Sequence, residues 1–201
     1  SDKDKKLTAY HEAGHAVVSK FLPTQTDVKE VSIIPRGWAL GVTWTRPKSE
    51  KLHVSREKLL ARIAMALGGR AAEEIVYGPD KIGTGASQDL QNVTSIAKKM
   101  VTEWGMSEKM GNLAYGKSQE NVFMGRDFGH QKDYSEEIAS EIDKEIKRIV
   151  DEQYARAIKL LTDNRDMLDR LANELLERET IDEAEFGEIM EEVISQRGQI
   201  G

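Results

Sequence analysis

Apolar residues recur every three to four positions through long stretches of this chain, the spacing that places side chains on one face of an α-helix. It predicts a helix over about 7–21, ended by Pro23, a second over 56–77 and a third over about 87–104. A long helix begins near 134 and breaks at about Asn164, and two shorter helices follow it. Residues 134–195 are therefore expected to form a helical hairpin with a tail.

Short polar residues mark where several of these helices should begin. Ser55 and Ser87 each stand just before an apolar helical stretch and are predicted to be N-caps. Asp182 and Glu185 stand three residues apart ahead of the last such stretch, which is the spacing of a capping box.

Two strands are predicted between the first two helices. Residues 28–35 are rich in valine and isoleucine, a turn is expected at 35–37, and 38–45 alternate large apolar with small residues. The fold class is therefore mainly α with a small β-sheet. The second strand is a candidate for an exposed sheet edge that binds an extended peptide, although its pattern fits a purely structural hairpin equally well. The residues concerned are Trp38, Ala39, Leu40, Gly41, Val42 and Thr43.

Composition narrows the function classes. The 201 residues contain no cysteine, which excludes disulfides and a thiolate zinc site. The net charge of −6 and the lack of a basic block argue against nucleic-acid binding. No apolar run reaches the roughly 18–20 residues needed to span a bilayer, so this fragment is expected to be soluble. The abrupt, charged stretch at 1–6 suggests a flexible end and a piece of a larger protein.

Residues 11–15 have the sequence H-E-A-G-H, which matches the zincin-like pattern H-E-x-x-H. Residues four apart lie on the same face of a helix, so His11 and His15 can bind one metal ion. Zinc suits imidazole and carboxylate ligands, and a catalytic zinc lowers the pKa of its water toward ~7. Glu12 stands beside them and can take the proton as the water attacks a carbonyl.

A catalytic zinc takes three protein ligands, so one more is needed. His53, His130 and Asp80 are further candidates, and the two histidines are expected to be exposed. Asp89, in the first turn of its helix, shares a face with apolar residues, and a carboxylate there needs a partner. Glu73 and Glu74 on the helix over 56–77 are equally reasonable from the residues alone, so the choice stays open at this point. The alternative to catalysis is a helical oligomerisation module with a structural metal.

Two adjacent glycines lie inside the helix predicted over 56–77. Each costs roughly 1 kcal/mol against alanine in a helix interior. We expect close packing of Gly68 and Gly69 onto the Gly14 face of the first helix to offset this cost.

Residues 111–118 satisfy the P-loop pattern G-x-x-x-x-G-K-S/T, which works only between a buried strand and a helix. The residues before it are charged and typical of a helix end, and those after it have no helical stripe. We therefore expect no nucleotide site here.

Several motifs in order closely resemble the peptidase domain of the FtsH family, the membrane-anchored, ATP-dependent zinc metalloproteases. The likeness covers about 7–193 and includes T-A-Y-H-E-A-G-H-A at 8–16, P-R-G at 35–37, A-L-G-V-T at 39–43, L-G-G-R-A-A-E-E at 67–74, T-G-A-S-Q-D-L at 84–90 and M-V-T-E-W-G-M at 100–106. Trp38 departs from the polar or basic residue expected there, which puts substrate preference near that strand in doubt.

The resemblance implies that residues 1–201 are a single zinc metallopeptidase domain. It implies one Zn²⁺ per chain bound by His11, His15 and Asp89, with Glu12 as the catalytic base. It also implies that unfolded polypeptides are the substrates and that the full-length protein is a homo-hexamer at the cytoplasmic face of the inner membrane, held there by upstream segments that this chain lacks.

Overall fold

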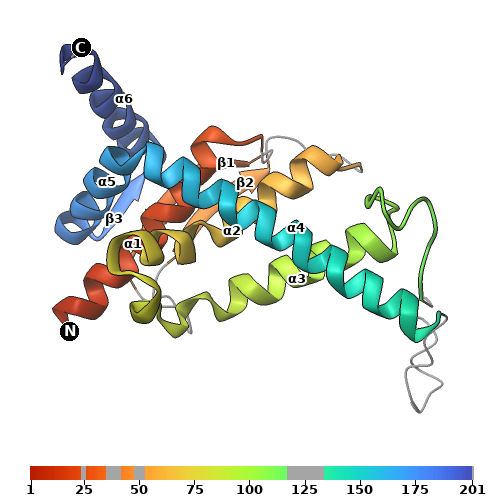
Figure 1. Ribbon diagram of the computed structural model, residues 1–201. Coiled ribbons are helices and arrows are strands. Elements are labelled where there is room, and N and C mark those ends of the chain that lie inside the picture. Colours follow the sequence, from red (N-terminus) through yellow and green to blue (C-terminus); the bar gives the residue numbers. More distant parts are fainter. Residues whose placement is uncertain (24–25, 35–41, 48–52, 117–133, 201) are drawn as a thin grey trace.

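The computed structural model describes residues 1–23, 26–34, 42–47, 53–116 and 134–200 (Figure 1). Helices dominate these residues and a small sheet accompanies them, which confirms the predicted fold class. The elements in chain order are α1 (Asp2–Phe21), β1 (Thr26–Ser32), β2 (Val42–Pro47), α2 (Arg56–Tyr77), the 3-10 turns η1 (Pro79–Lys81) and η2 (Thr84–Ala86), α3 (Ser87–Thr102), α4 (Glu136–Asp163), α5 (Arg165–Arg178), β3 (Thr180–Asp182) and α6 (Glu183–Ile200).

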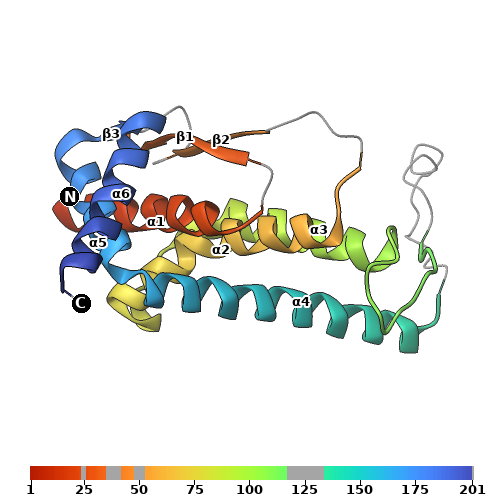
Figure 2. The same cartoon turned by 90° about the horizontal axis from the view of Figure 1, so that it is seen from above.

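Helix α1 lies at the centre of the fold. The sheet covers one side of α1 and α2 packs on another, while the long helix α4 runs along α2 (Figure 2). After the break at Asn164, α5 turns back and packs on α1. Within the described part of the chain, no helix is both long and apolar enough to cross a bilayer.

The sheet has the order β2-β1-β3 with antiparallel pairing throughout. β2 is therefore an edge strand, as expected for part of the stretch 38–45. β3 was not expected from the sequence. Its three residues are too few for a visible alternation, and it forms because Val31 and Ile181, both fully buried, face each other across the pair.

The helix caps were predicted with mixed success. Ser55 accepts a hydrogen bond from the Lys58 amide, as expected. The capping box is also confirmed, because the Glu185 amide donates to Asp182 and the Asp182 amide donates to Glu185. Ser87 is wrong as a cap: it is the first residue of α3, and η2 runs directly into the helix at Ala86.

Helix α1 begins at Asp2 rather than near Leu7. The Ser1 hydroxyl accepts from the Asp4 amide and caps the helix, so the charged residues 1–6 form its first turns instead of a flexible end. The apolar pattern could not reveal this, because none of these residues is apolar and the turns are exposed.

Two groups of buried apolar side chains stabilise the fold. The first lies between α1, the sheet, α5 and α6, and includes Val17, Val31, Leu168, Leu171 and Met190. The second lies between α2, α3 and α4, and includes Ile63, Leu67, Val93, Met100 and Ile149. Each helix thus buries the apolar face that its sequence spacing predicted.

Helices α1 and α2 approach each other through glycine, as the sequence suggested. A β-carbon at Gly14 would lie 2.3 Å from the Gly68 carbonyl oxygen, and one at Gly68 would lie 2.8 Å from the Gly14 carbonyl oxygen. The two backbones are therefore in direct contact where they cross, directly beside His15.

Candidate metal centre

Three side chains from two helices converge beside α1. His11 and His15 project from successive turns of α1, and Asp89 projects from the first turn of α3. The Asp89 Oδ2 atom lies 3.2 Å from His11 Nε2 and 3.3 Å from His15 Nε2, and the two Nε2 atoms are 3.1 Å apart. Within the described ranges, these residues form the one group of histidine and acidic side chains whose ligand atoms could share a metal ion.

Helix α2 holds both imidazole rings by their other nitrogen. His11 Nδ1 donates to Glu73 Oε2 at 2.7 Å, and His15 Nδ1 donates to the Met65 carbonyl oxygen at 2.8 Å. With hydrogen on both Nδ1 atoms, the neutral rings present the lone pair of Nε2 toward Asp89. This is the tautomer that a metal ligand needs.

Glu73 also fixes the approach to α3. Its side chain is only 2% exposed, and its second oxygen accepts the Gly83 amide at 3.1 Å. Gly83 begins the short segment that leads through η2 to Asp89. One carboxylate thus ties a ring on α1 to the chain that positions the third side chain.

The electrostatics of the group favour a positive charge between these residues. Burial opposes protonation of His11, but the hydrogen bonds to Asp89 and Glu73 outweigh it and raise the pKa of His11 to about 10. Burial also opposes ionisation of Asp89, but hydrogen bonds to His11 and His15 hold the pKa of Asp89 well below its usual range. Negative charge thus surrounds the two rings, which favours a cation between the three side chains.

Glu12 lies beside the group without belonging to it. The residue is 5% exposed on α1, and its negative charge is one of the influences that raise the pKa of His11. Glu12 therefore adds negative charge next to the His11 ring.

The other third-ligand candidates lie elsewhere. Glu74 accepts a hydrogen bond from the Tyr154 hydroxyl at 2.5 Å on the α4 side of α2. His53 is exposed, as expected, Asp80 is exposed as well, and His130 lies outside the described residues. Glu73 reaches His11 but at Nδ1, so it supports a ring instead of joining Asp89. Sequence reasoning missed this supporting role, although Glu73 stands among small apolar residues on a buried face of α2.

The candidate peptide-binding strand is described only in part. Trp38, Ala39, Leu40 and Gly41 lie outside the described residues. Val42 and Thr43 belong to the edge strand β2 and pair with β1 opposite Ser32 and Val31.

The P-loop pattern is described over 111–116, and 117–118 lie outside the described residues. It follows α3 through an irregular segment, so the strand that the motif requires before it is absent from this part of the chain.

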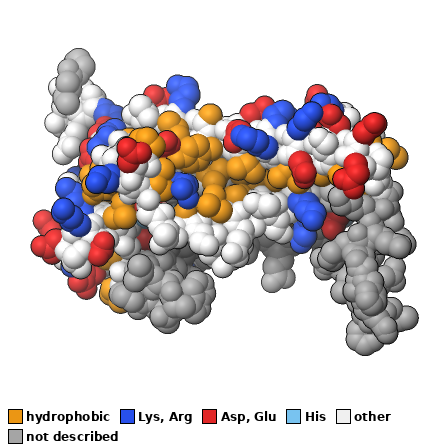
Figure 3. Space-filling model, turned by 60° about the horizontal axis from the view of Figure 1, so that its bottom comes forward, with side chains coloured by type: hydrophobic (Ala, Val, Ile, Leu, Met, Phe, Trp, Pro, Cys, Tyr) orange, Lys and Arg blue, Asp and Glu red, His pale blue; other side chains and the backbone are white. Residues whose placement is uncertain are grey.

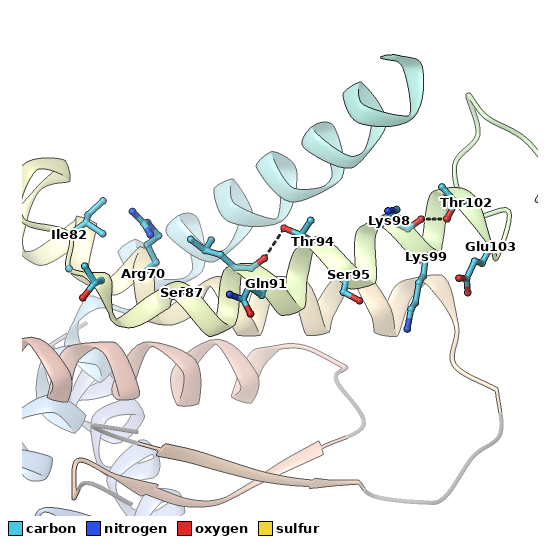
Figure 4. Close-up of a pocket in the computed structure, with 13 residues that line it drawn as sticks. Arg70, Ile82, Ser87, Gln91, Thr94, Ser95, Lys98, Lys99, Thr102 and Glu103 are labelled. Carbon is cyan, nitrogen blue, oxygen red and sulfur yellow. Dashed lines mark hydrogen bonds between the residues drawn. The ribbon is translucent and has the colours of Figure 1, made fainter. Parts of the chain in front are cut away.

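A hollow of about 1030 Å³ lies along α3 (Figure 4). Its lining includes Arg70, Thr94, Lys98 and Glu103, but none of His11, His15 and Asp89. The three converging side chains therefore lie outside this hollow.

A histidine pair on one helix, an adjacent glutamate and a carboxylate from a second helix define the class of metal-dependent hydrolases. The comparison with protein families specifies this class further. The model of peptidase family M41 matches residues 1–189, so the chain belongs to that family.

Curated relatives are highly similar. The chain is 53% identical to the ATP-dependent zinc metalloprotease FtsH of Veillonella parvula, over 90% of this chain and 28% of the relative. It is 50% identical to the FtsH of Rubrobacter xylanophilus, over 96% of this chain and 29% of the relative. It is 51% identical to FtsH 1 of a Thermoanaerobacter species, over 94% of this chain and 31% of the relative. The chain thus spans less than a third of the length of these relatives.

Proposed function

We propose that this chain is the zinc endopeptidase module of an ATP-dependent protease and hydrolyses peptide bonds of unfolded polypeptides. The observation that supports it most directly is the convergence of His11 Nε2, His15 Nε2 and Asp89 Oδ2 within 3.3 Å of one another. The relatives are named zinc metalloproteases, and these names support peptide hydrolysis as the reaction at the metal group.

The three donor atoms fit zinc. Two imidazole nitrogens and one carboxylate oxygen are a set typical of catalytic zinc, and three protein ligands leave a fourth position open. The low pKa of Asp89 keeps the carboxylate charged at neutral pH. When bound, zinc would supply Lewis acidity, lowering the pKa of water and polarising a carbonyl oxygen.

The protein's own residues would carry the protons. The Glu12 carboxylate would accept a proton from the attacking water and deliver it to the leaving amine nitrogen as the peptide bond breaks. Glu73 and the Met65 carbonyl would keep both rings in the Nδ1–H tautomer throughout, because each accepts a hydrogen bond from a ring.

Substrate would bind in an extended conformation along the edge proposed for 38–43. Among the described strands β2 lies at one edge of the sheet, which supports this role, because a peptide can add to an edge as a further strand. Backbone hydrogen bonds do not distinguish side chains, so the cleavage preference would be broad. Trp38, Ala39, Leu40, Gly41, Val42 and Thr43 are the residues proposed to line this edge.

In the full-length protein, the module would form a homo-hexamer with an ATPase at the cytoplasmic face of the inner membrane. The relatives are more than three times as long as the matched region, which leaves room for such segments. A continuous strip of hydrophobic side chains on one face (Figure 3) supports an assembly that covers this face.

The test is bound-zinc analysis paired with casein hydrolysis with and without a chelator. We expect about one zinc per chain and hydrolysis that the chelator abolishes and added zinc restores. Bound zinc without any hydrolysis would favour the alternative, a helical oligomerisation module with a structural metal.

A further inference from the structure

The two adjacent glycines of α2 face different neighbours. Gly68 contacts backbone, since a β-carbon there would lie 2.8 Å from the Gly14 carbonyl oxygen. A β-carbon at Gly69 would instead lie 2.5 Å from Cε1, 2.5 Å from Nε2 and 2.7 Å from Cδ2 of the His11 ring. Only the second glycine therefore touches the metal group.

Gly69 occupies the middle of a stripe on α2 that supports both rings. Met65 stands four residues before it and accepts from His15, and Glu73 stands four residues after it and accepts from His11. Residues spaced by four lie one turn apart on the same helix face. The stripe thus provides two hydrogen-bond acceptors with an empty position between them, and the His11 ring fills that position.

The ring could not share this space with a methyl group. Separations of 2.5 Å between carbon or nitrogen atoms lie far inside van der Waals contact, where atoms attract best at about 3.5–4.0 Å. The backbones of α1 and α2 are in direct contact at Gly14 and Gly68, so moving the helices apart would break that packing. The part that can move is the His11 side chain, which turns about two torsions.

We propose that Gly69 is a positioning residue for His11: its missing side chain leaves the space that holds the ring with Nε2 directed at Asp89 and His15. A side chain at position 69 would push the ring off Glu73 and turn Nε2 away from the other two donor atoms. This explains why the helix interior carries a glycine here despite the cost of roughly 1 kcal/mol against alanine. The role of Gly69 in zinc binding rests on the proposed function. The packing of the His11 ring against Gly69 does not depend on it.

The first experiment compares zinc affinity in Gly69→Ala and Gly187→Ala. Gly187 is a matched control, because it is exposed inside α6 and a β-carbon there meets nothing within 4 Å. Both changes improve helix propensity, but only the first displaces a ligand. We expect Gly69→Ala to weaken zinc binding by at least about tenfold, a loss typical of disturbed ligand support. Gly187→Ala should bind as the unchanged chain does, and equal affinity in both variants would overturn the proposal.

The second experiment is a double-mutant cycle on the thermal midpoint of the metal-free chain, so that it does not depend on zinc. Gly69→Ala should lower the midpoint when His11 is present and raise it in a His11→Ala background, where the ring is gone. Gly68→Ala should lower it in both backgrounds, because its contact is with the Gly14 backbone.

A Gly69→Ala chain that does not fold must regain folding when His11→Ala is added. A midpoint that falls equally in both backgrounds, or folding that is not regained, would overturn the proposal. An unchanged chain that binds no zinc would contradict the proposed function, and the metal-free cycle would still decide the packing relation.

Discussion

Two regions around α1 are packed in different ways. One is the interface of α1 with α2, and the other is the core between α1, α5 and α6. At the first, Gly14 and Gly68 bring two backbones into direct contact. At the second, large side chains such as Leu168, Leu171 and Met190 are fully buried. Backbones in contact have no side-chain torsions that can yield, so this interface can hold ligands to narrow tolerances. The large side chains contribute most of the apolar area that folding removes from water.

The first interface mainly fixes the geometry of the site, whereas the second core mainly supplies stability. Changes at the first interface should therefore lower zinc affinity as well as stability. Changes in the second core should lower stability and leave zinc affinity unchanged. The following predictions test this separation in order of decreasing effect.

Glu12→Gln should give the largest change. The amide cannot accept the proton of the attacking water, so casein hydrolysis should fall by about 10²–10⁴-fold. Zinc content and thermal midpoint should stay close to those of the unchanged chain. A variant with undiminished activity would show that Glu12 is not the base.

Asp89→Asn should weaken zinc retention by more than about 100-fold, since it removes the only charged donor atom of the group. Glu74→Gln is the matched control, because Glu74 bonds to Tyr154 and does not reach the rings. Zinc affinity is measured by competition with a chelator. The reverse order of the two variants would mean that the third ligand is wrongly assigned.

Leu171→Ala should destabilise the fold by about 2–5 kcal/mol, because it leaves a cavity at a fully buried position. Zinc bound per folded molecule should not change, since the side chain lies in the core around α5. Urea unfolding and zinc content measured together would check both statements. A loss of zinc affinity along with stability would contradict the separate roles of the core and the metal group.

Gly14→Ala should destabilise by about 1–3 kcal/mol through overpacking, because the new methyl meets the Gly68 carbonyl and the Ala72 side chain. Zinc affinity should fall as well, since the displaced backbone carries His15. Unfolding in urea and chelator competition give the two quantities. A variant as stable as the unchanged chain would contradict the close approach of α1 and α2.

Glu145→Gln should have the smallest effect on stability at neutral pH. Its main effect should be on how stability changes with pH. A hydrogen bond from Arg148 lowers the pKa of Glu145, and one from Ser107 adds to this against the opposing effect of burial. The stability from this carboxylate is therefore complete above the ordinary pKa of 4.5 and is lost as pH falls through the lowered value. The variant should lose less stability on acidification than the unchanged chain, as urea midpoints across this range would reveal. Parallel pH curves would contradict the prediction.

Much of the fold could be predicted from the sequence because its signals are local. Side-chain hydrogen bonds to nearby amides mark two helix starts, one at Ser55 and one at the pair Asp182 and Glu185. Ser87 misled because a 3-10 turn can lead straight into a helix without a side-chain cap. β3 could not be predicted, since its three residues are held by pairing with β1 instead of by their own pattern.

The candidate site was predictable only where it is local. His11 and His15 share one helix, so their spacing alone brings them together. The choice between Asp89 and Glu73 depends on tertiary structure. Glu73 reaches Nδ1 of His11 from α2, and Asp89 reaches Nε2 from α3. No pattern along the chain reports which nitrogen a distant carboxylate will face. The resemblance to a family made this choice, and the assignment of Asp89 as the third ligand stays a prediction.

The central claim is that His11, His15 and Asp89 bind one metal ion together. X-ray absorption at the zinc edge of the zinc-loaded chain tests this most directly, because imidazole rings scatter in a recognisable way. The account predicts two imidazoles with the remaining ligands oxygen in the unchanged chain, and one imidazole fewer in His15→Ala. A spectrum with fewer than two imidazoles in the unchanged chain, or one that His15→Ala leaves unaltered, would contradict it.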